Sequence, residues 1–362
     1  MKKILFLFII FFSTLGCKSI SIEEHNFVKL NFLDEYILSE NVMINGAIVG
    51  GLSGIDYHNG IFYIVSDDAY DPRLYEATID IQHRKISDIS IRKEIKVIDA
   101  INYLDLESIR YGSNNEILLT SEGHITAKKD PLFFSVDTLG NVKKNYKLPE
   151  YIKSSSIQKP RHNGTLEGLT ISFDKKGFWI AMELPLEADG EEPALVITNS
   201  PVRITYIDKE SNLPTKAFAY KLDMIAKIPK GNFAVNGLTD ILMYEEDKFY
   251  VVERSYSSGL GNQGNTVKIF NVDASKATNI LDFDNLKNTA YLSAKKELLF
   301  DFETIRDSLT DKSIDNIEGV TFGPILPNKN RTLLLVADNN FNQLGPQQNQ
   351  FILLEIVDQN SK

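Results

Sequence analysis

The residues of this sequence best suited to chemistry are acids that follow short apolar, β-branched runs. These runs span residues 61–67, 116–122, 177–183, 248–253 and 331–338, and they end on Asp67, Glu122, Glu183, Glu253 and Asp338. A short turn of small or acidic residues and an aliphatic precedes each run, and three of these turns carry a further glutamate: Glu107, Glu167 and Glu318. Carboxylate oxygens are hard ligands that suit calcium or magnesium better than zinc.

A cation site built from these acids is the first expectation. The five histidines show no metal-ligand spacing among themselves, and the chain has one cysteine, so a zinc site is disfavoured. We expect Ca²⁺, with Mg²⁺ as an alternative, at a set of seven acids: Glu107, Glu122, Glu167, Glu183, Glu253, Glu318 and Asp338. The competing interpretation is that some of these acids cap turns by accepting hydrogen bonds from backbone amides.

Arginines lie close to the same acidic positions. Arg254 directly follows Glu253, and Arg73 follows the acidic segment 67–71. The planar guanidinium could hold a phosphate or a carboxylate in a bidentate manner, or it could pair with neighbouring carboxylates of the chain. No serine lies in a nucleophile-elbow context and no Ser-His-Asp order is apparent, so serine-esterase chemistry is weakly supported.

The elements that position these residues form a repeated unit. Each unit consists of the turn, the strand that ends on an acid, a strand that ends on Asp, and in most units a further strand after another turn. Four antiparallel strands repeated radially are typical of a propeller blade, so we predict an all-β β-propeller with five repeat units. The stretch 274–312 leaves room for a sixth blade, and a β-sandwich is the competing fold.

The first and last strands should meet. The final unit ends at Asp358 with no sequence left for an outer strand, while residues 27–38 alternate well enough to form one. We therefore predict that the N-terminal strand closes the last blade. Equivalent positions of successive blades surround one axis, so the strand-end acids should form a ring of negative charge that needs a cation, a proton or a cationic substrate.

Composition and the N-terminus bear on location and partners. The chain has 362 residues, with 39 Lys+Arg against 49 Asp+Glu and a net charge of −10, which argues against a nucleic-acid surface. Residues 1–16 have the layout of a secretory signal, and Cys17 follows a small residue as in a lipobox. We expect lipidation at Cys17, a tether over 17–26 and one domain over 27–362.

These features predict a protein exported across the inner membrane and lipid-anchored in the cell envelope, with the outer membrane favoured over the inner one. An ordinary cleaved signal with an incidental cysteine is the alternative. We expect a monomer that binds no nucleic acid and acts on a small-molecule ester or phosphoester.

Several segments together resemble the phytase-like family described as "esterase-like activity of phytase". These are Gly50–Ile55, Ser66–Asp68 with Arg73, Ser121–Gly123, Asn163–Leu169, Val252–Ser255, Asp315–Gly319 and Ala337–Phe341, in the order the family keeps. The resemblance implies a propeller that gathers calcium ions in an acidic channel to hydrolyse phosphomonoesters. In this interpretation Arg254 or Arg73 steadies the developing charge. We expect Glu167 and Glu318 to be essential to the reaction, so that alanine at these positions abolishes activity with only a modest loss of folding.

Three functions fit these sequence features. A calcium-dependent phosphate-ester hydrolase fits the acids and the resemblance best, although the chain lacks the dense Lys/Arg lining that an inositol polyphosphate would favour. A carboxylic-ester or lactone hydrolase at a channel calcium fits the same acids. A non-catalytic envelope protein that uses the propeller as a binding platform is the third possibility, because one fold hosts unrelated functions.

Overall fold

The computed structural model describes residues 28–98, 103–342 and 346–358. The predicted signal peptide (1–16), the lipidation site Cys17 and the tether (17–26) lie outside the described residues. Within the described part of the chain, none of the helices has the length and apolar content needed to cross a membrane.

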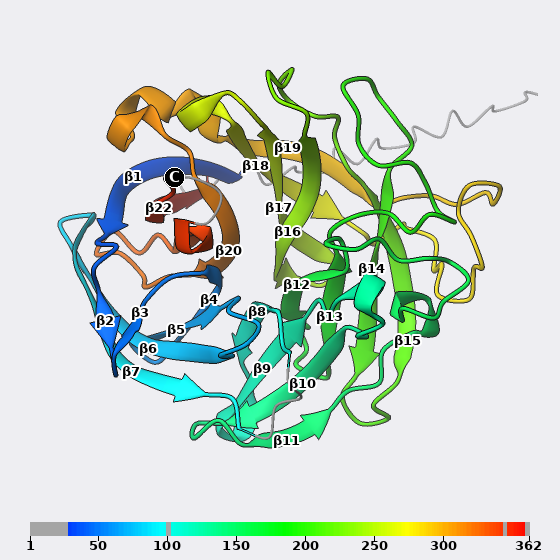
Figure 1. Cartoon of the computed structure of the whole chain (residues 1–362), viewed down its shortest axis with the longest axis horizontal. Coiled ribbons are helices and arrows are strands. Elements are labelled where there is room, and N and C mark those ends of the chain that lie inside the picture. Colours follow the sequence, from blue (N-terminus) through cyan, green and yellow to red (C-terminus); the bar gives the residue numbers. More distant parts are fainter. Residues whose placement is uncertain (1–27, 99–102, 343–345, 359–362) are drawn as a thin grey trace, which may run out of the picture.

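Five four-stranded antiparallel sheets surround a central axis, so the chain is a five-bladed β-propeller (Figure 1). From the axis outward, the first blade is β4 (Leu52–His58), β5 (Ile61–Ser66), β6 (Arg73–Gln82) and β7 (Lys85–Lys96). The second is β8 (Leu106–Tyr111), β9 (Glu116–Ser121), β10 (Leu132–Asp137) and β11 (Val142–Asn145). The third is β12 (Leu166–Ile171), β13 (Gly177–Met182), β14 (Pro201–Asp208) and β15 (Pro214–Lys221). The fourth is β16 (Ala234–Glu245), β17 (Lys248–Ser257), β18 (Asn265–Asp273) and β19 (Lys295–Asp301).

The fifth blade joins the two ends of the described chain. Its strands are β20 (Asn316–Phe322), β21 (Thr332–Asp338), β22 (Asn349–Asp358) and, outermost, β1 (Val28–Leu38). Strand β1 runs antiparallel to β22, from Val28 opposite Asp358 to Leu38 opposite Asn349. The prediction that the N-terminal strand closes the last blade is therefore confirmed.

The stretch 274–312 forms no sixth blade. It supplies the outer strand β19 and the short 3₁₀ helices η5 (Phe302–Thr304), η6 (Arg306–Ser308) and η7 (Thr310–Lys312). The other short elements are the hairpin β2 (Met43–Ile44) and β3 (Ala47–Ile48), and η1 (Ser113–Asn115), η2 (Ile125–Ala127), η3 (Glu150–Ile152), η4 (Gly261–Gln263) and η8 (Asn340–Asn342).

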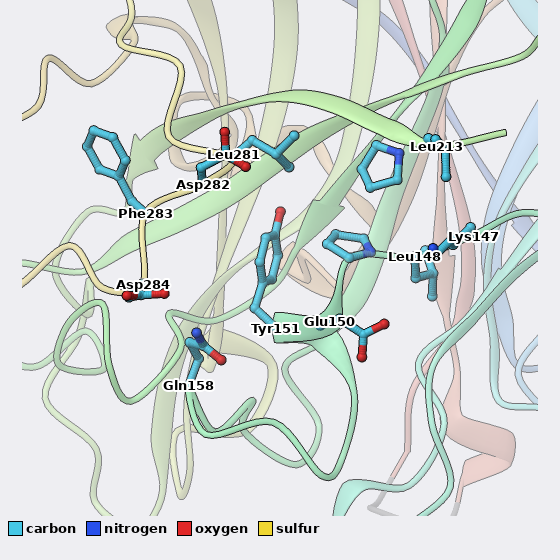
Figure 2. A pocket seen from close by; sticks show the side chains of 12 residues that line it. Lys147, Leu148, Glu150, Tyr151, Gln158, Leu213, Leu281, Asp282, Phe283 and Asp284 are labelled. Atoms are coloured by element: carbon cyan, nitrogen blue, oxygen red, sulfur yellow. The ribbon is translucent and has the colours of Figure 1, made fainter. Parts of the chain in front are cut away.

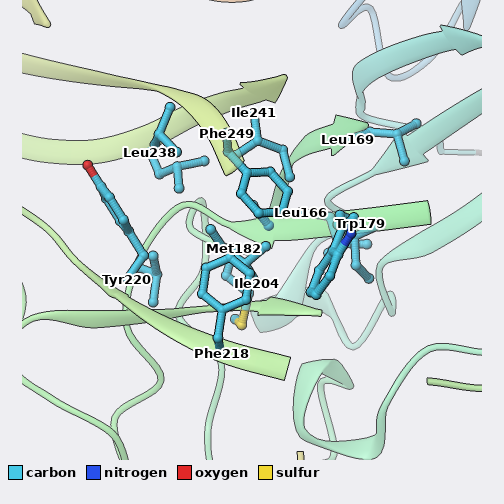
Figure 3. Packing of buried hydrophobic residues seen from close by; sticks show 14 of the residues in the cluster. Leu166, Leu169, Trp179, Met182, Ile204, Phe218, Tyr220, Leu238, Ile241 and Phe249 are labelled. Atoms are coloured by element: carbon cyan, nitrogen blue, oxygen red, sulfur yellow. The ribbon is translucent and has the colours of Figure 1, made fainter. Parts of the chain in front are cut away.

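The hydrophobic core lies between neighbouring blades, where the apolar faces of their sheets meet. Figure 3 shows the cluster between the third and fourth blades, in which Trp179 lies edge-on to Phe218 and to Phe249. Strands such as β13 and β21 are buried at every position, so the sheets bury both faces there against their neighbours. Since Phe249 is fully buried, Phe249→Ala should cost about 3–5 kcal/mol of stability.

The connections between strands lie on two faces of the ring. On one face, two-residue turns at 59–60 and 83–84 join β4 to β5 and β6 to β7. On the other face, the inner strands begin, and the long connections 146–165, 183–200 and 222–233 lie there. We call this second face the acid face, because the strand-end acids of the second strands also lie on it.

Candidate functional site

The register of the blades defines which strand-end residues are equivalent. In each inner strand, the residue just before a shift in the pairing register marks an equivalent position. It lies opposite Ser66 in the first blade, Ser121 in the second, Met182 in the third and Glu253 in the fourth. In the fifth blade, Ile317 lies opposite Ala337. The residues that come next are therefore equivalent: Asp67, Glu122, Glu183, Arg254 and Asp338. Four blades contribute an acid at this position, and the fourth blade contributes an arginine.

A second set of equivalent residues lies at a bulge near the start of every inner strand. The pairing register shifts there in all five blades, and the residues at the shift are Ser53, Glu107, Glu167, Thr239 and Glu318. A bulge leaves a residue unpaired and re-aims its side chain, and such bulges are common next to active sites. The three predicted turn glutamates occupy this position.

The acids of these two sets and Asp105 interact electrostatically with one another. We call the acid cluster the eight residues Asp67, Asp105, Glu107, Glu122, Glu167, Glu183, Glu318 and Asp338. Six of the seven predicted metal ligands belong to it, and Glu253 does not. The sequence interpretation did not include Asp67 and Asp105 among the ligands, although Asp67 ends the first run and Asp105 precedes the turn glutamate of the second unit.

Three members of the acid cluster lie close enough to share a cation. One carboxylate oxygen each of Asp105, Glu107 and Glu122 lies within 4.8 Å of the other two. The hydroxyl of Tyr103 donates to Asp105 Oδ2 at 3.0 Å, which holds that carboxylate in place. Glu122 is 3% exposed, and its Oε2 is buried without a hydrogen-bond partner among residues 28–98, 103–342 and 346–358. An orphaned carboxylate oxygen is costly, so this position calls for a ligand.

Arg254 lies among the other acids of the cluster. Its Nη2 is 3.7 Å from Glu183 Oε1 and 3.5 Å from Glu318 Oε1, and its Nε is buried without a partner. The amide of Asn316 donates to Glu318 Oε1 at 2.8 Å and to Asp338 Oδ2 at 3.3 Å. The guanidinium thus makes loose ion pairs and retains donor capacity for a bound anion.

The pKa values of the cluster acids are raised. Burial, together with the charges of neighbouring acids, raises the pKa of Asp67 to about 8, and burial raises that of Asp105 to about 6. Burial also raises the pKa of Glu183 to about 7 and of Glu318 to about 8, although Arg254 lowers both. The pKa values of Glu107, Glu122, Glu167 and Asp338 lie well above their usual range for the same reasons. Each acid must therefore hold a proton or face a cation.

Two glycines make room for the cluster. A Cβ atom on Gly51, whose φ is +64°, would lie 2.0 Å from Asp67 Oδ1. A Cβ atom on Gly237 would lie 2.5 Å from Glu183 Oε1. Any side chain at either position would displace the carboxylate beside it.

Two predicted site residues have partners elsewhere. The Glu253 carboxylate accepts hydrogen bonds from the Tyr220 hydroxyl at 2.5 Å and from Lys296 Nζ at 2.6 Å. These contacts form a buried network on the opposite face of β17 from Arg254. Arg73 donates to Asp68 at 2.8 Å and to the Tyr75 hydroxyl at 2.7 Å. The placement of Glu253 does not support its assignment as a ligand. The contacts of Arg73 are those expected if it pairs with neighbouring carboxylates of the chain.

An ion pair closes the axis beneath the acid cluster. Arg110 Nη2 donates to both carboxylate oxygens of Asp240, at 3.0 and 2.8 Å, and both side chains are buried. Asp240 also accepts from the amides of Leu169 and Val320, and Arg110 Nη1 donates to the carbonyl of Ile55. The pair thereby links inner strands of all five blades.

A cavity formed by the described residues lies away from these acids. It has a volume of about 490 Å³ and is lined by Tyr151, Leu213, Phe283 and nine other residues, none of which belongs to the acid cluster (Figure 2). This cavity therefore does not mark the acid cluster, and the charge arrangement on the axis is the stronger indication of a site.

Comparison with known proteins gives a family and several structures of low similarity. No curated protein sequence matches significantly. Among solved structures, glutaminyl cyclase from Myxococcus xanthus is similar at 9% identity and a TM-score of 0.42, over 91% of this chain and 98% of that chain. The GH43 endo-arabinanase from Bacillus licheniformis is similar at 14% identity and a TM-score of 0.40, over 86% and 96%. A family model described as "Phytase-like: Esterase-like activity of phytase" matches residues 47–341. The chain belongs to this phytase-like family.

Proposed function

We propose that the protein is a calcium-dependent hydrolase of phosphate esters, with Mg²⁺ as the alternative ion. The observation that carries the proposal is a buried acid cluster with an orphaned Glu122 oxygen beside an incompletely paired arginine. Membership in the phytase-like family supports a hydrolase of ester bonds. Without a bound cation, the concentration of unpaired negative charge in the acid cluster would have no explanation.

The residues fit a calcium ion. Calcium takes oxygen ligands at about 2.3–2.6 Å, so oxygens bound to one ion lie up to roughly 5 Å apart. The oxygens of Asp105, Glu107 and Glu122 meet this condition, because they lie within 4.8 Å of one another. Glu167 joins the same group of charges and would complete or share the site. When bound, the ion would neutralise these acids and act as a Lewis acid toward an ester oxygen.

Arg254 would bind and orient the substrate anion. Its guanidinium is held between Glu183 and Glu318, and its buried Nε is free of protein partners among the described residues. Donors placed where negative charge develops stabilise a transition state more than a ground state. Glu318, whose pKa is raised to about 8, could hold a proton at neutral pH and deliver it to the leaving oxygen.

A carboxylic-ester or lactone hydrolase is the second candidate. One observation favours it: in the described part of the chain, Arg254 is the one Lys or Arg that forms an ion pair with the acid cluster. A substrate that carries less charge than a phosphate needs fewer cations to balance it. The two functions share the acid cluster and differ in the charge that the substrate brings.

The test uses the purified protein, freed of metal and then titrated with CaCl₂ or MgCl₂. p-Nitrophenyl phosphate and p-nitrophenyl acetate serve as matched substrates with one leaving group. We expect calcium-dependent release of nitrophenol from the phosphate, and a loss of about 100-fold in Glu122→Gln and Arg254→Met. Glu150→Gln, at an exposed acid outside the cluster, is the control. Turnover of the acetate alone would select the second candidate, and turnover of neither would sink both.

A further inference from the structure

Four aromatic rings from separate loops contact one another in series on the acid face. Tyr70 lies in the connection from β5 to β6, Tyr103 directly precedes β8, His124 follows β9, and His162 precedes β12. The ring centroids of Tyr70 and Tyr103 are 5.5 Å apart, those of Tyr103 and His124 are 5.7 Å apart, and those of His124 and His162 are 4.2 Å apart. We call this set the aromatic row.

The row is fastened to the acid cluster. The Tyr103 hydroxyl donates to Asp105 Oδ2, so the second ring touches one of the three acids that fit a cation. The orientation of the His124 ring is fixed by a hydrogen bond, because its Nδ1 accepts from the backbone amide of Ala127. Lys129 Nζ lies 4.1 Å from the Tyr103 ring centroid and adds positive charge beside it.

Core packing does not account for the row. Tyr70 is 83% exposed and His162 is exposed, while rings such as Phe133 and Phe178 make their contact within the buried core. Burial of apolar area is what normally positions aromatic rings, and Tyr70 and His162 gain little of it, while Tyr103 and His124 are half-buried. Their shared feature is that they extend from Asp105 outward along the face that carries the acid cluster.

We propose that the aromatic row is a subsite for a flat ring in the alcohol portion of the substrate ester. The inference rests on the proposed function, since it places the ester group at the acid cluster and the ring against the row. Aromatic faces stack on other aromatic rings and on the apolar face of a pyranose, so an aryl ester and a sugar ester share the chemistry that the row recognises. An acyclic ester would gain nothing from it.

The experiment compares ring-bearing and acyclic phosphates with the intact calcium-loaded protein. Phenyl phosphate, glucose 6-phosphate and glycerol 3-phosphate are the probes, and kcat and KM are measured for the wild type, Tyr70→Ala, His162→Ala and the double variant. Phe173→Ala, which removes an exposed aromatic ring from the opposite face, is the matched control. We expect each row variant to raise KM for a ring-bearing probe about 3- to 10-fold and to leave glycerol 3-phosphate unchanged.

The outcomes separate the two proposals. Selective loss for phenyl phosphate alone identifies an aryl ester, and loss for glucose 6-phosphate alone identifies a sugar ester. Equal loss for all three probes, or no loss, overturns the subsite. If the wild type hydrolyses no probe, the proposed function fails, and calorimetric binding of phenylphosphonate against methylphosphonate decides the subsite. Weaker binding of phenylphosphonate alone in Tyr70→Ala would then support the row, and unchanged binding would overturn it.

Discussion

Two groups of buried charge occupy the axis of this propeller, and they are built in opposite ways. The Arg110–Asp240 pair matches one cation with one anion, and backbone amides of neighbouring blades donate to the carboxylate. The acid cluster next to it sets eight carboxyls against Arg254, and in the part of the chain that the structure describes, one oxygen each of Asp67 and Glu122 has no hydrogen-bond partner. The pair lies on inner strands, and the acid cluster combines residues near the starts of inner strands with residues at the ends of the second strands. The same blades therefore carry both arrangements, and the fold itself does not force either one.

The difference indicates which charges serve the fold and which await a ligand. A buried ion pair with satisfied hydrogen bonds can hold a structure in register, and its loss leaves one buried charge unpaired. A buried group of like charges destabilises the empty protein, so a cation site is the simplest reason for its presence. The comparison predicts that neutralising an acid should have opposite effects in the two groups.

The largest effect should follow from breaking the pair. Asp240→Asn leaves Arg110 buried without its counter-charge, and we expect a loss of about 3–5 kcal/mol in the free energy of unfolding. Urea denaturation of the calcium-free protein measures it. Asp284→Asn, at the rim of the surface cavity, provides the control. A loss below about 1 kcal/mol would mean that the pair does not secure the axis.

The pH dependence of stability should report the acid cluster. The pKa values of Glu183, Glu318 and Asp67 are raised to about 7, 8 and 8 in the folded protein. The folded state therefore binds more protons than the unfolded state above about pH 4, and stability falls as the pH rises through these values. Each pKa unit of such a shift corresponds to about 1.4 kcal/mol, so we expect the calcium-free protein to lose more than about 3 kcal/mol between pH 5 and pH 8.5.

Calcium should oppose this loss, because it binds the ionised cluster. A concentration 100 times the dissociation constant would restore about 2.7 kcal/mol at pH 8.5. Thermal denaturation with EDTA or with CaCl₂ at both pH values measures the effect. An equal response to calcium at pH 5 and pH 8.5 would contradict the assignment of the raised pKa values to the ion site.

Neutralising one cluster acid should stabilise the empty protein. Glu122→Gln keeps the shape of the side chain and removes the charge that burial and neighbouring acids disfavour. We expect a gain of about 1–3 kcal/mol at pH 8 without calcium and a smaller stabilisation when calcium is added. Destabilisation at pH 8 would instead support a role for Glu122 in capping the turn.

Much of this arrangement follows from the sequence. The five repeat units, the closure by the first strand and six of the cluster acids could be predicted, because apolar runs and turn residues repeat in order. In the fourth blade, the sequence does not indicate which residue occupies the position equivalent to the strand-end acids. Glu253 ends its apolar run as the other acids do, yet pairing puts it opposite Leu238, and Arg254 takes the equivalent position. A shift of one residue turns a strand side chain to the other face of the sheet, and the amino-acid sequence alone does not reveal the pairing register.

The smallest effect on calcium binding should come from Glu253 itself, and it tests whether this residue belongs to the ligand set. Glu253→Gln weakens the contact with Lys296 and should cost about 1–3 kcal/mol of stability, because Glu253 is 2% exposed and Lys296 keeps its charge. Since the carboxylate lies outside the acid cluster, the stabilisation by calcium at pH 8.5 should stay unchanged. Calcium titrations followed by thermal denaturation compare it with Glu122→Gln. A reduced calcium response in Glu253→Gln would return this residue to the ligand set and would make the register argument insufficient to define the site.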